Sequence, residues 1–264
     1  MARSCLADSL QIAQHAHDDF HTAGALCGLA HANYYTGDLE GAMTCGKAAV
    51  ELARAVGDPV LLGECLVAFA AVVDDPLACR AIYEEALTVT RRSGDRIHTA
   101  WSHNNLGNSL LSEGDLDAAR HHFEQARVIL REVGTPTPLP DLNLGWVHLR
   151  RGDVRAADAA FTEALHKSEL LHNRREAGWS VLALACSAAA AQQWERAACL
   201  IGFSDAELDD CGAIWAEPEQ TYRAQSFADI QNHLGIDFDR YYDSGRVGDR
   251  HDLIGFALGQ QQPL

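Results

Sequence analysis

Residues 104–126 read NNLGNSLLSEGDLDAARHHFEQA, and this stretch decides the fold. Its order is a Leu-Gly pair, a Gly-Asp turn, and then Ala119, Phe123 and Ala126. Glycine ends a helix in the left-handed conformation, and aspartate at the next N-cap accepts hydrogen bonds from free backbone N–H groups. The three residues after the turn share one helix stripe, because their spacing is four and then three positions. The stretch therefore predicts two helices that pack through small residues and one large side chain.

The same order recurs five times along the chain, which indicates a repeat protein. The small residue after each turn recurs at intervals of 37 to 40 residues, at Ala42, Cys79, Ala119, Ala157 and Ala197. A second turn closes each repeat, at Gly57-Asp58-Pro59, Gly94-Asp95, Gly134-Thr135-Pro136, His172-Asn173 and Gly212. No run alternates with a period of two for long enough to form a strand. We therefore expect an all-α fold.

Residues 104–126 and 142–164 resemble the tetratricopeptide repeat (TPR), which shares the Leu-Gly pair, the Gly-Asp turn and the Ala, Phe and Ala that follow. The resemblance extends over residues 23–212 and is closest in the third and fourth repeats. It implies an α-solenoid, a right-handed superhelix of helix-turn-helix repeats. The first helix of each repeat would line its concave wall.

The predicted organisation has three parts: a leading half-repeat helix (1–22), five TPR-like repeats (23–212) and a C-terminal helical cap (213–264). Projected backwards, the repeat pattern makes residues 2–18 the second helix of a repeat whose first helix is missing. Either a capping helix or an origin in a longer array explains this half repeat.

The cap departs from the repeat period. We expect its first helix to start at Glu217-Pro218-Glu219, Gly245 to end a second helix, and a last helix to run from Asp249 to Leu258. The C-terminal part resembles the end of the helical-repeat region in large bacterial regulators of the LuxR and SARP types. The residues that carry this resemblance are Leu200, Ile201, Gly202, Phe203, Ile214, Pro218, Tyr222, Phe238, Gly245, Arg246, Asp252, Leu253, Ala257 and Leu258.

This second resemblance implies the sensor and scaffold portion of a bacterial transcriptional regulator. Such regulators carry a nucleotide-binding ATPase module before the repeats, and the LuxR type carries a helix-turn-helix after them. The sequence contains no Gly-x-x-x-x-Gly-Lys-Ser/Thr motif, so nothing in it predicts a triphosphate site.

Charge and composition exclude several classes of function. The 21 Lys and Arg against 37 Asp and Glu give a net charge of −16, and no basic patch interrupts it, so we expect no direct nucleic-acid binding. The sequence has neither a signal peptide nor an apolar run of about 18 residues, which predicts a cytoplasmic protein with no membrane contact. The 8 cysteines are far apart in apolar helical surroundings, which favours reduced core thiols over disulfides.

Inward-facing positions on the first helices predict a groove for a protein segment or an apolar small-molecule effector. The candidate residues are His31, Tyr34, Tyr35, Glu64, Trp101, Asn104, Asn108, Trp146, Arg150 and Trp179, with Cys186 on the same wall. Aromatic rings, amides and one cation make this surface suitable for binding. A tryptophan at such a position also commonly fills the seam between neighbouring repeats, and this alternative stays open. The lysines of a carboxylate-gripping groove are absent.

No metal, cofactor or catalytic residue is expected. The 13 histidines form no ligand motif, because neighbouring pairs diverge on a helix and no Cys-x-x-Cys or His-Glu-x-x-His accompanies them. The acidic run of residues 205–210 either holds a cation or, more ordinarily, forms the solvated face of a helix.

Three functions follow from these observations. The first is a non-catalytic binding module that uses the groove, in bacterial transcriptional regulation. The second is self-association, or docking to a separate ATPase chain, through residues 1–18, which present a stripe of Leu6, Leu10 and Ala13 that we expect to be exposed. The third is an enzyme built on the repeats, for which the only inward polar group is His31, Cys27 and Glu64.

Overall fold

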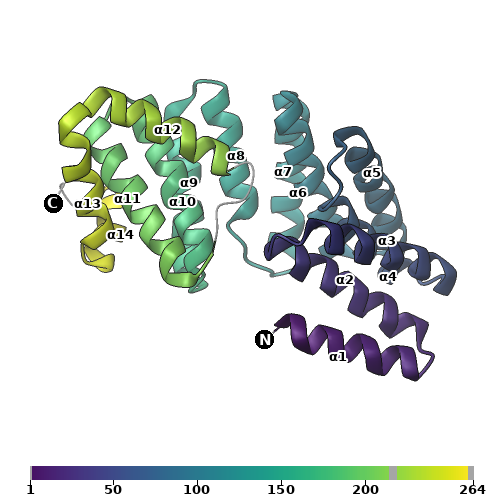
Figure 1. Ribbon diagram of the computed structural model, residues 1–264. Coiled ribbons are helices and arrows are strands. Elements are labelled where there is room, and N and C mark those ends of the chain that lie inside the picture. The colour runs from purple at the N-terminus through teal and green to yellow at the C-terminus, as the bar shows by residue number, and fades with distance from the viewer. Residues whose placement is uncertain (1, 214–218, 261–264) are drawn as a thin grey trace. The chain divides into compact units, whose positions relative to one another are not determined.

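The computed structural model describes residues 2–213 and 219–260, and every regular element in those ranges is a helix (Figure 1). The predicted all-α fold class is therefore confirmed. The chain forms two compact units, residues 1–135 (unit 1) and 136–264 (unit 2). None of the helices in the described ranges is both long enough and apolar enough to cross a membrane.

Unit 1 is built from one leading helix and three helical hairpins. Its helices are α1 (Ala2–His15), α2 (Asp19–Tyr35), α3 (Leu39–Val56), α4 (Pro59–Ala70), α5 (Pro76–Ser93), α6 (Arg96–Glu113) and α7 (Leu116–Glu132). The hairpins are α2 with α3, α4 with α5, and α6 with α7, and each packs on the next one along the chain. Helix α1 packs against α2, as the second helix of a preceding repeat would.

Unit 2 contains two further hairpins and a cap. Its elements are α8 (Leu139–Arg150), α9 (Val154–Leu170), α10 (Arg174–Ala190), α11 (Trp194–Cys211), α12 (Glu219–Leu234), a 3-10 turn (Gly235–Asp237), α13 (Phe238–Val247) and α14 (Arg250–Ala257). Helix α8 pairs with α9 and α10 with α11. Helix α12 lies across α10 and α11, while α13 packs along α11 (Figure 1).

The turns between helices follow the predicted capping chemistry. Side chains at the N-caps accept hydrogen bonds from the backbone N–H groups of the following helix at Asp18, Asp38, Asp58, Asp75, Asp95, Asp115, Asp153 and Asn173. Gln193 stands at the N-cap of α11 and makes no such bond. The N-terminal ends of nearly all the repeat helices are thus stabilised by one local interaction that recurs along the sequence.

A glycine on the first helix of a hairpin contacts a phenylalanine on the second. A Cβ added at Gly107 would lie 2.6 Å from Cε1 of Phe123, and one added at Gly145 would overlap the ring of Phe161. Both rings are fully buried. The Leu-Gly pair and the phenylalanine of the repeat are therefore the two halves of one contact, as the sequence pattern predicts.

One expectation for the cap is wrong, and another concerns residues that the structure does not describe. Gly245 does not end a helix: α13 continues to Val247, and Gly245 lies inside it, so close to α11 that an added Cβ would overlap the carbonyl oxygen of Cys199. On the facing helix, Gly202 is equally close to the carbonyl of Tyr242. Glycine is needed here for close approach of two backbones. The expected helix start at residues 217–218, and Ile214, lie outside the described residues.

The apolar stripe of α1 is not exposed, contrary to the expectation. Ala13 is 5% exposed, Leu6 and Leu10 are half-buried, and the Leu6 side chain lies against Gly28 of α2. The stripe packs inside unit 1 because α2 presents an apolar face to it. The large apolar side chain that α1 does expose is Ile12.

All eight cysteines are free thiols, as predicted. Their expected place in the core holds for four of them, whereas Cys5 and Cys211 are exposed.

Candidate functional site

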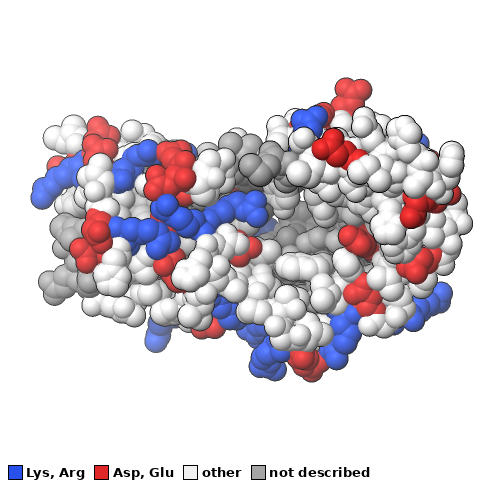
Figure 2. Space-filling view, turned by 90° about the horizontal axis from the view of Figure 1, so that it is seen from below, with Lys and Arg blue, Asp and Glu red and all other residues white. Residues whose placement is uncertain are grey.

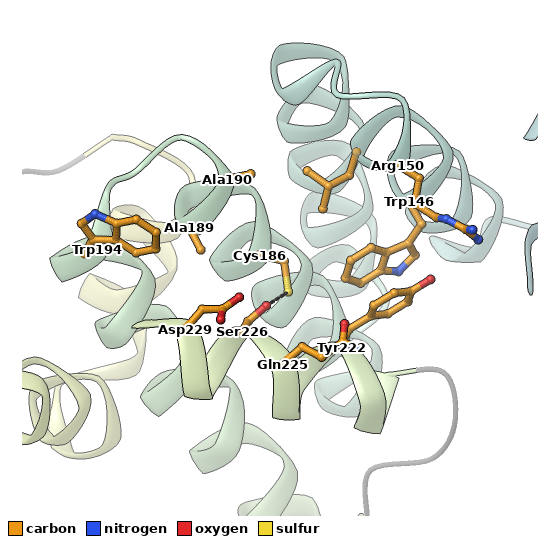
Figure 3. A pocket seen from close by; sticks show the side chains of 11 residues that line it. Trp146, Arg150, Cys186, Ala189, Ala190, Trp194, Tyr222, Gln225, Ser226 and Asp229 are labelled. Carbon is orange, nitrogen blue, oxygen red and sulfur yellow. Dashed lines mark hydrogen bonds between the residues drawn. The ribbon is translucent and has the colours of Figure 1, made fainter. Parts of the chain in front are cut away.

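A cavity of about 300 Å³ lies inside unit 2, between α8, α10, the start of α11 and α12 (Figure 3). We call it the α12 pocket. It is lined by Trp146, Leu149, Arg150, Cys186, Ala189, Ala190, Trp194, Tyr222, Gln225, Ser226 and Asp229. The lining combines three aromatic rings, three aliphatic side chains, three neutral polar side chains, one arginine and one aspartate. Mostly apolar walls with a few polar groups are typical of a small-ligand site.

Trp146 forms an aromatic wall of the pocket. The residue is 2% exposed, and its ring stacks on that of Tyr222 with 4.1 Å between centroids and 18° between planes. Its other ring contact is edge-on with Phe161, at 5.1 Å. The indole Nε1 is buried and has no hydrogen-bond partner among the described residues. A buried donor in this state lacks an acceptor worth about 1–3 kcal/mol.

Hydrogen-bond donors gather near Trp146 (Figure 3). Burial raises the pKa of Tyr222, while the charge of the Arg150 guanidinium and a hydrogen bond with it act in the opposite direction. The phenol therefore stays protonated at neutral pH. Arg150 itself is exposed and carries five N–H donors. This part of the pocket offers an indole N–H and a phenol beside a guanidinium, and the Glu219 carboxylate also acts on Tyr222, so it favours a neutral acceptor.

The opposite end of the pocket is formed by Asp229 and Trp194 (Figure 3). The Asp229 carboxylate has no hydrogen bond or ion pair with any described residue. The Trp194 ring stacks on His233, with 3.8 Å between centroids and 10° between planes. A carboxylate beside an aromatic ring favours a cation.

The middle of the pocket contains a thiol and a hydroxyl. Cys186 Sγ and Ser226 Oγ are 3.1 Å apart. Burial raises the pKa of Cys186 to about 12, so the group is a neutral thiol at physiological pH rather than a nucleophilic thiolate. The pair closes the pocket between α10 and α12 and gives no sign of covalent chemistry.

The structure brings together two of the predicted groove residues, Trp146 and Arg150, along with Cys186. Trp179 is not part of this pocket: it is half-buried, and the Arg175 guanidinium lies 5.3 Å from its ring centroid. The ligand-binding role of all these residues stays a prediction.

The other predicted groove residues belong to unit 1. Glu64, Asn108 and Tyr35 are exposed, while His31, Tyr34 and Trp101 are half-buried. Asn104 is buried and donates a hydrogen bond to the amide oxygen of Asn105 at 3.2 Å. Burial lowers the pKa of His31, and the nearby Glu64 carboxylate partly offsets this. These residues differ in exposure, and none of them lines the α12 pocket.

Sequence reasoning missed the residues that α12 adds to the pocket. They occupy one helix face at positions i, i+3, i+4 and i+7, namely Tyr222, Gln225, Ser226 and Asp229. The periodicity of a face is visible in a sequence, but the element against which this face packs is not. Trp146 and Tyr222 meet although they are 76 positions apart.

Two members of the acidic run on α11, Asp205 and Glu207, are buried, whereas Asp209 and Asp210 lie on an exposed face. Glu207 is buried between Arg174, at 2.5 Å, and Arg250, at 2.8 Å. Asp205 is 6% exposed and accepts hydrogen bonds from Arg223 and from the Tyr242 hydroxyl. The two more exposed members of the run, Asp209 and Asp210, also pair with arginines.

The arginine partners of the run come from α10 and from the cap helices α12, α13 and α14, so the pairs with the cap helices fasten the cap to α11. Figure 2 shows basic and acidic side chains interleaved over the part of unit 2 seen from below. The described residues contain no group of three His, Cys, Asp or Glu arranged to hold a metal.

In the inward polar group of unit 1, the thiol of Cys27 is disfavoured as a thiolate nucleophile. Cys27 is buried, and its Sγ lies 4.0 Å from the backbone oxygen of Glu64. A hydrogen bond with Cys65 and then burial raise the pKa of Cys27 far above its usual range, so the thiolate is disfavoured. Burial lowers the pKa of His31, which favours its neutral imidazole.

Comparison with known proteins supports the repeat fold. Residues 61–132, which span α4 to α7, match the family model of the tetratricopeptide repeat. The TPR resemblance is thus confirmed for these residues. No curated protein matches the sequence significantly. The narrower resemblance to LuxR and SARP regulators stays a prediction.

Three solved structures are similar to this chain. BtubC from P. vanneervenii has a TM-score of 0.62 and 18% identity, over 82% of this chain and 93% of that chain. The apo form of RapI has a TM-score of 0.59 and 13% identity, over 92% of both. A signal transduction ATPase with numerous domains (STAND) and a tetratricopeptide repeat sensor, from Pyrococcus horikoshii, has a TM-score of 0.59 and 15% identity, over 95% of this chain and 37% of that chain. At these identities the likeness shows the shared fold alone.

Proposed function

We propose that this chain is a non-catalytic binding module that captures a protein segment or a small effector in the α12 pocket. The observation that carries the proposal is the buried Nε1 of Trp146, which has no partner among the described residues and belongs to a residue that lines a cavity. A ligand that supplies an acceptor would satisfy this donor. The stacked Tyr222 holds the indole in place, so the site is formed before the ligand arrives.

The proposed biological setting is bacterial transcriptional regulation, with this chain as a sensor. The support is the LuxR and SARP resemblance of the cap together with the likeness to a STAND protein that has a tetratricopeptide repeat sensor. A sensor of this kind needs a ligand site and a surface for its partner, and the α12 pocket supplies the first. The groove residues of unit 1, such as Asn108 and Tyr35, are proposed to contribute to partner binding.

A peptide library displayed on phage, with random 12-residue inserts, tests the proposal. Selection would be run in parallel on the wild type and on an Arg150→Gln, Asp229→Asn variant, which changes two exposed pocket residues. The matched control is Arg155→Gln, Asp239→Asn, at exposed positions outside the pocket. We expect peptides that bind the wild type and the control and lose binding to the pocket variant. Peptides that bind all three equally, or no enriched peptide together with no small molecule retained by the purified protein in native mass spectrometry, would overturn the proposed function.

A further inference from the structure

The α12 pocket has two chemically different ends, with Cys186 and Ser226 between them (Figure 3). Resting on the proposed function, we propose that its ligand is a small primary amine with a neutral carbonyl acceptor at the far end of a short apolar chain. The ammonium lies at the Asp229 end and the carbonyl oxygen at the Trp146 end. A linear diamine that is acylated on one nitrogen has all of these features.

The Trp146 end of the pocket lacks an acceptor and already contains charges of both signs. The indole Nε1 is buried, and no described residue accepts a hydrogen bond from it. The neighbouring Tyr222 phenol hydrogen-bonds the Arg150 guanidinium and also interacts with the Glu219 carboxylate. A carbonyl oxygen would complete the hydrogen bond of the indole without adding a charge. A ligand carboxylate would instead be repelled by Glu219.

The Asp229 end of the pocket lacks a cation. The Asp229 carboxylate has no hydrogen-bond or ion-pair partner in the described part of the chain. Gln225 lines the same cavity one helical turn before Asp229 on α12. A primary ammonium has three N–H donors, so it is able to bind the carboxylate and the amide oxygen together. The Trp194 ring, which also lines this end, would add the attraction of an aromatic ring for a cation.

The middle of the pocket suits methylene groups. Leu149, Ala189 and Ala190 supply the aliphatic part of the lining. The polar groups of the middle, Cys186 Sγ and Ser226 Oγ, are 3.1 Å apart and hydrogen-bond to each other. Because these two groups pair with each other, a ligand needs no polar atom between its two ends.

The distance between the two ends determines the length of the ligand. Tyr222 and Asp229 are 7 positions apart on α12, which separates them by about 10.5 Å along the helix axis. N-(5-aminopentyl)acetamide has as many main-chain atoms as the backbone of three residues, so it spans at most roughly 10–11 Å. The cavity of about 300 Å³ is at the lower end of the range for ligand pockets, which also favours a small molecule.

Calorimetric titration of the full chain with N-(5-aminopentyl)acetamide tests the inference. Three probes of equal length each change one end of this compound. N-hexylacetamide lacks the ammonium, octan-1-amine lacks the carbonyl group, and 8-aminooctanoic acid has a carboxylate in place of the amide. We expect each probe to bind at least about tenfold more weakly than N-(5-aminopentyl)acetamide, because each leaves one end of the pocket without its matching group.

Variants of the pocket assign each end of the ligand to a residue. Asp229→Asn should weaken binding of N-(5-aminopentyl)acetamide by a similar factor and leave that of N-hexylacetamide unchanged. Trp146→Phe keeps an aromatic ring and removes the N–H, so it should weaken binding of N-(5-aminopentyl)acetamide and leave that of octan-1-amine unchanged, with the helical circular dichroism of the wild type. The matched controls, Asp239→Asn and Trp101→Phe, lie outside the pocket and should have no effect.

Three results would overturn the inference. If the four compounds bind equally, or if Asp229→Asn changes the binding of none of them, recognition of the two ends is wrong. If none of the compounds binds while a library peptide or a small molecule retained in native mass spectrometry does, this ligand class is wrong and the proposed binding function stands. If no compound and no library peptide binds and no small molecule is retained, the proposed function fails as well.

Discussion

The hairpins α6–α7 in unit 1 and α8–α9 in unit 2 are built by the same rule and have different surroundings. In both, a glycine of the first helix lies against a phenylalanine of the second, Gly107 on Phe123 and Gly145 on Phe161. The tryptophans of the two first helices then differ. Trp101 is half-buried and packs against the core of unit 1, whereas Trp146 is covered by the ring of Tyr222 from α12.

The repeat pattern thus determines how the two helices of each hairpin pack, whereas the non-repeating helix α12 completes the pocket. The described part of unit 1 contains only the repeat helices and α1, so nothing in it corresponds to α12. In unit 2, α12 adds one row of polar side chains to a wall that α8 and α10 already form. Two walls with the same helical pattern thereby acquire different binding chemistry. The predictions below alter one side of this contrast at a time.

We expect the largest loss of stability at the contact between the backbones of α13 and α11. Gly245→Ala places a methyl group onto the carbonyl oxygen of Cys199, so α13 must move away from α11. We expect a loss of about 4 kcal/mol in the free energy of unfolding of unit 2, the range of severe overpacking. Urea unfolding followed by tryptophan fluorescence measures it. The control is Gly24→Ala in α2, where an added Cβ has no neighbour within 4 Å.

The two substitutions make opposite predictions from the same change of side chain. In an open helical position, alanine is favoured over glycine by up to about 1 kcal/mol, so Gly24→Ala should be neutral or stabilising. A Gly245→Ala protein as stable as the wild type would show that the α11–α13 contact is looser than described.

The second effect concerns the ion pairs that hold the cap. Asp205→Asn removes the charge that accepts hydrogen bonds from Arg223 and Tyr242 and leaves a half-buried guanidinium without its counter-charge. We expect unit 2 to lose about 3 kcal/mol, because breaking a buried pair from one side is strongly destabilising. Chemical denaturation measures it. The exposed Asp239→Asn should change stability by less than about 0.5 kcal/mol, and an equal loss in both variants would contradict the role given to Asp205.

The third effect belongs to unit 1 and depends on a buried histidine, His103. Arg91 donates to Nε2 of His103 at 2.9 Å, so Nδ1 of His103 carries the proton and donates to Nδ1 of His122, also at 2.9 Å. Burial, then the charges of His122, Arg91 and His121, lower the pKa of His103 to about 3. A proton on Nε2 would face the Arg91 guanidinium, so the chain of hydrogen bonds requires a neutral ring.

Acid should therefore weaken unit 1 in a defined window. The pKa of His103 is lower in the folded state than its unfolded value of 6.5, so its contribution is complete above pH 6.5 and falls as the pH decreases toward 3. Between pH 6.5 and 5 this one group accounts for about 2 kcal/mol. Hydrogen exchange of α6 and α7 against α10 and α11 measures it. His103→Gln should flatten the dependence, and the exposed His166→Gln in unit 2 should not.

The sequence was sufficient for the hairpins because their interactions are local. N-cap aspartates such as Asp115 act within three residues, and Phe123 meets a glycine 16 positions earlier in the same hairpin. Counting the inward-facing positions of a first helix also placed Trp146 and Arg150 on the predicted wall, whereas it did not include Trp194 at the start of α11. The partners of Trp146 and Arg150 on α12 were not predicted. No local pattern says that Tyr222 stacks on Trp146 or that Asp229 faces the same cavity.

The acidic run shows the same limit from the side of charge. Four carboxylates between residues 205 and 210 suit a solvated helix face by composition, and the pattern gives no reason to expect them in the core. Asp205 and Glu207 are nevertheless buried, and they pair with arginines from α10, α12 and α14, among them Arg250, which is 43 positions from Glu207. A single charged residue is costly to bury, so these two carboxylates become part of the interior only when their arginine partners are in place.

We expect the smallest effect from removing the Tyr222 ring, which covers Trp146 and has no counterpart at Trp101 among the described residues. Tyr222→Leu removes the ring that stacks on Trp146 and keeps an apolar side chain over it. We expect a loss of about 1 kcal/mol in unit 2, the value of an aromatic pair beyond its buried area, and a red-shifted tryptophan emission as water reaches the indole. Tyr35→Leu, at an exposed position of unit 1, should change neither quantity. If Tyr222→Leu leaves the emission unchanged, Trp146 is buried by α8 and α9 alone. The contrast between the two walls would then rest on the repeat itself rather than on α12.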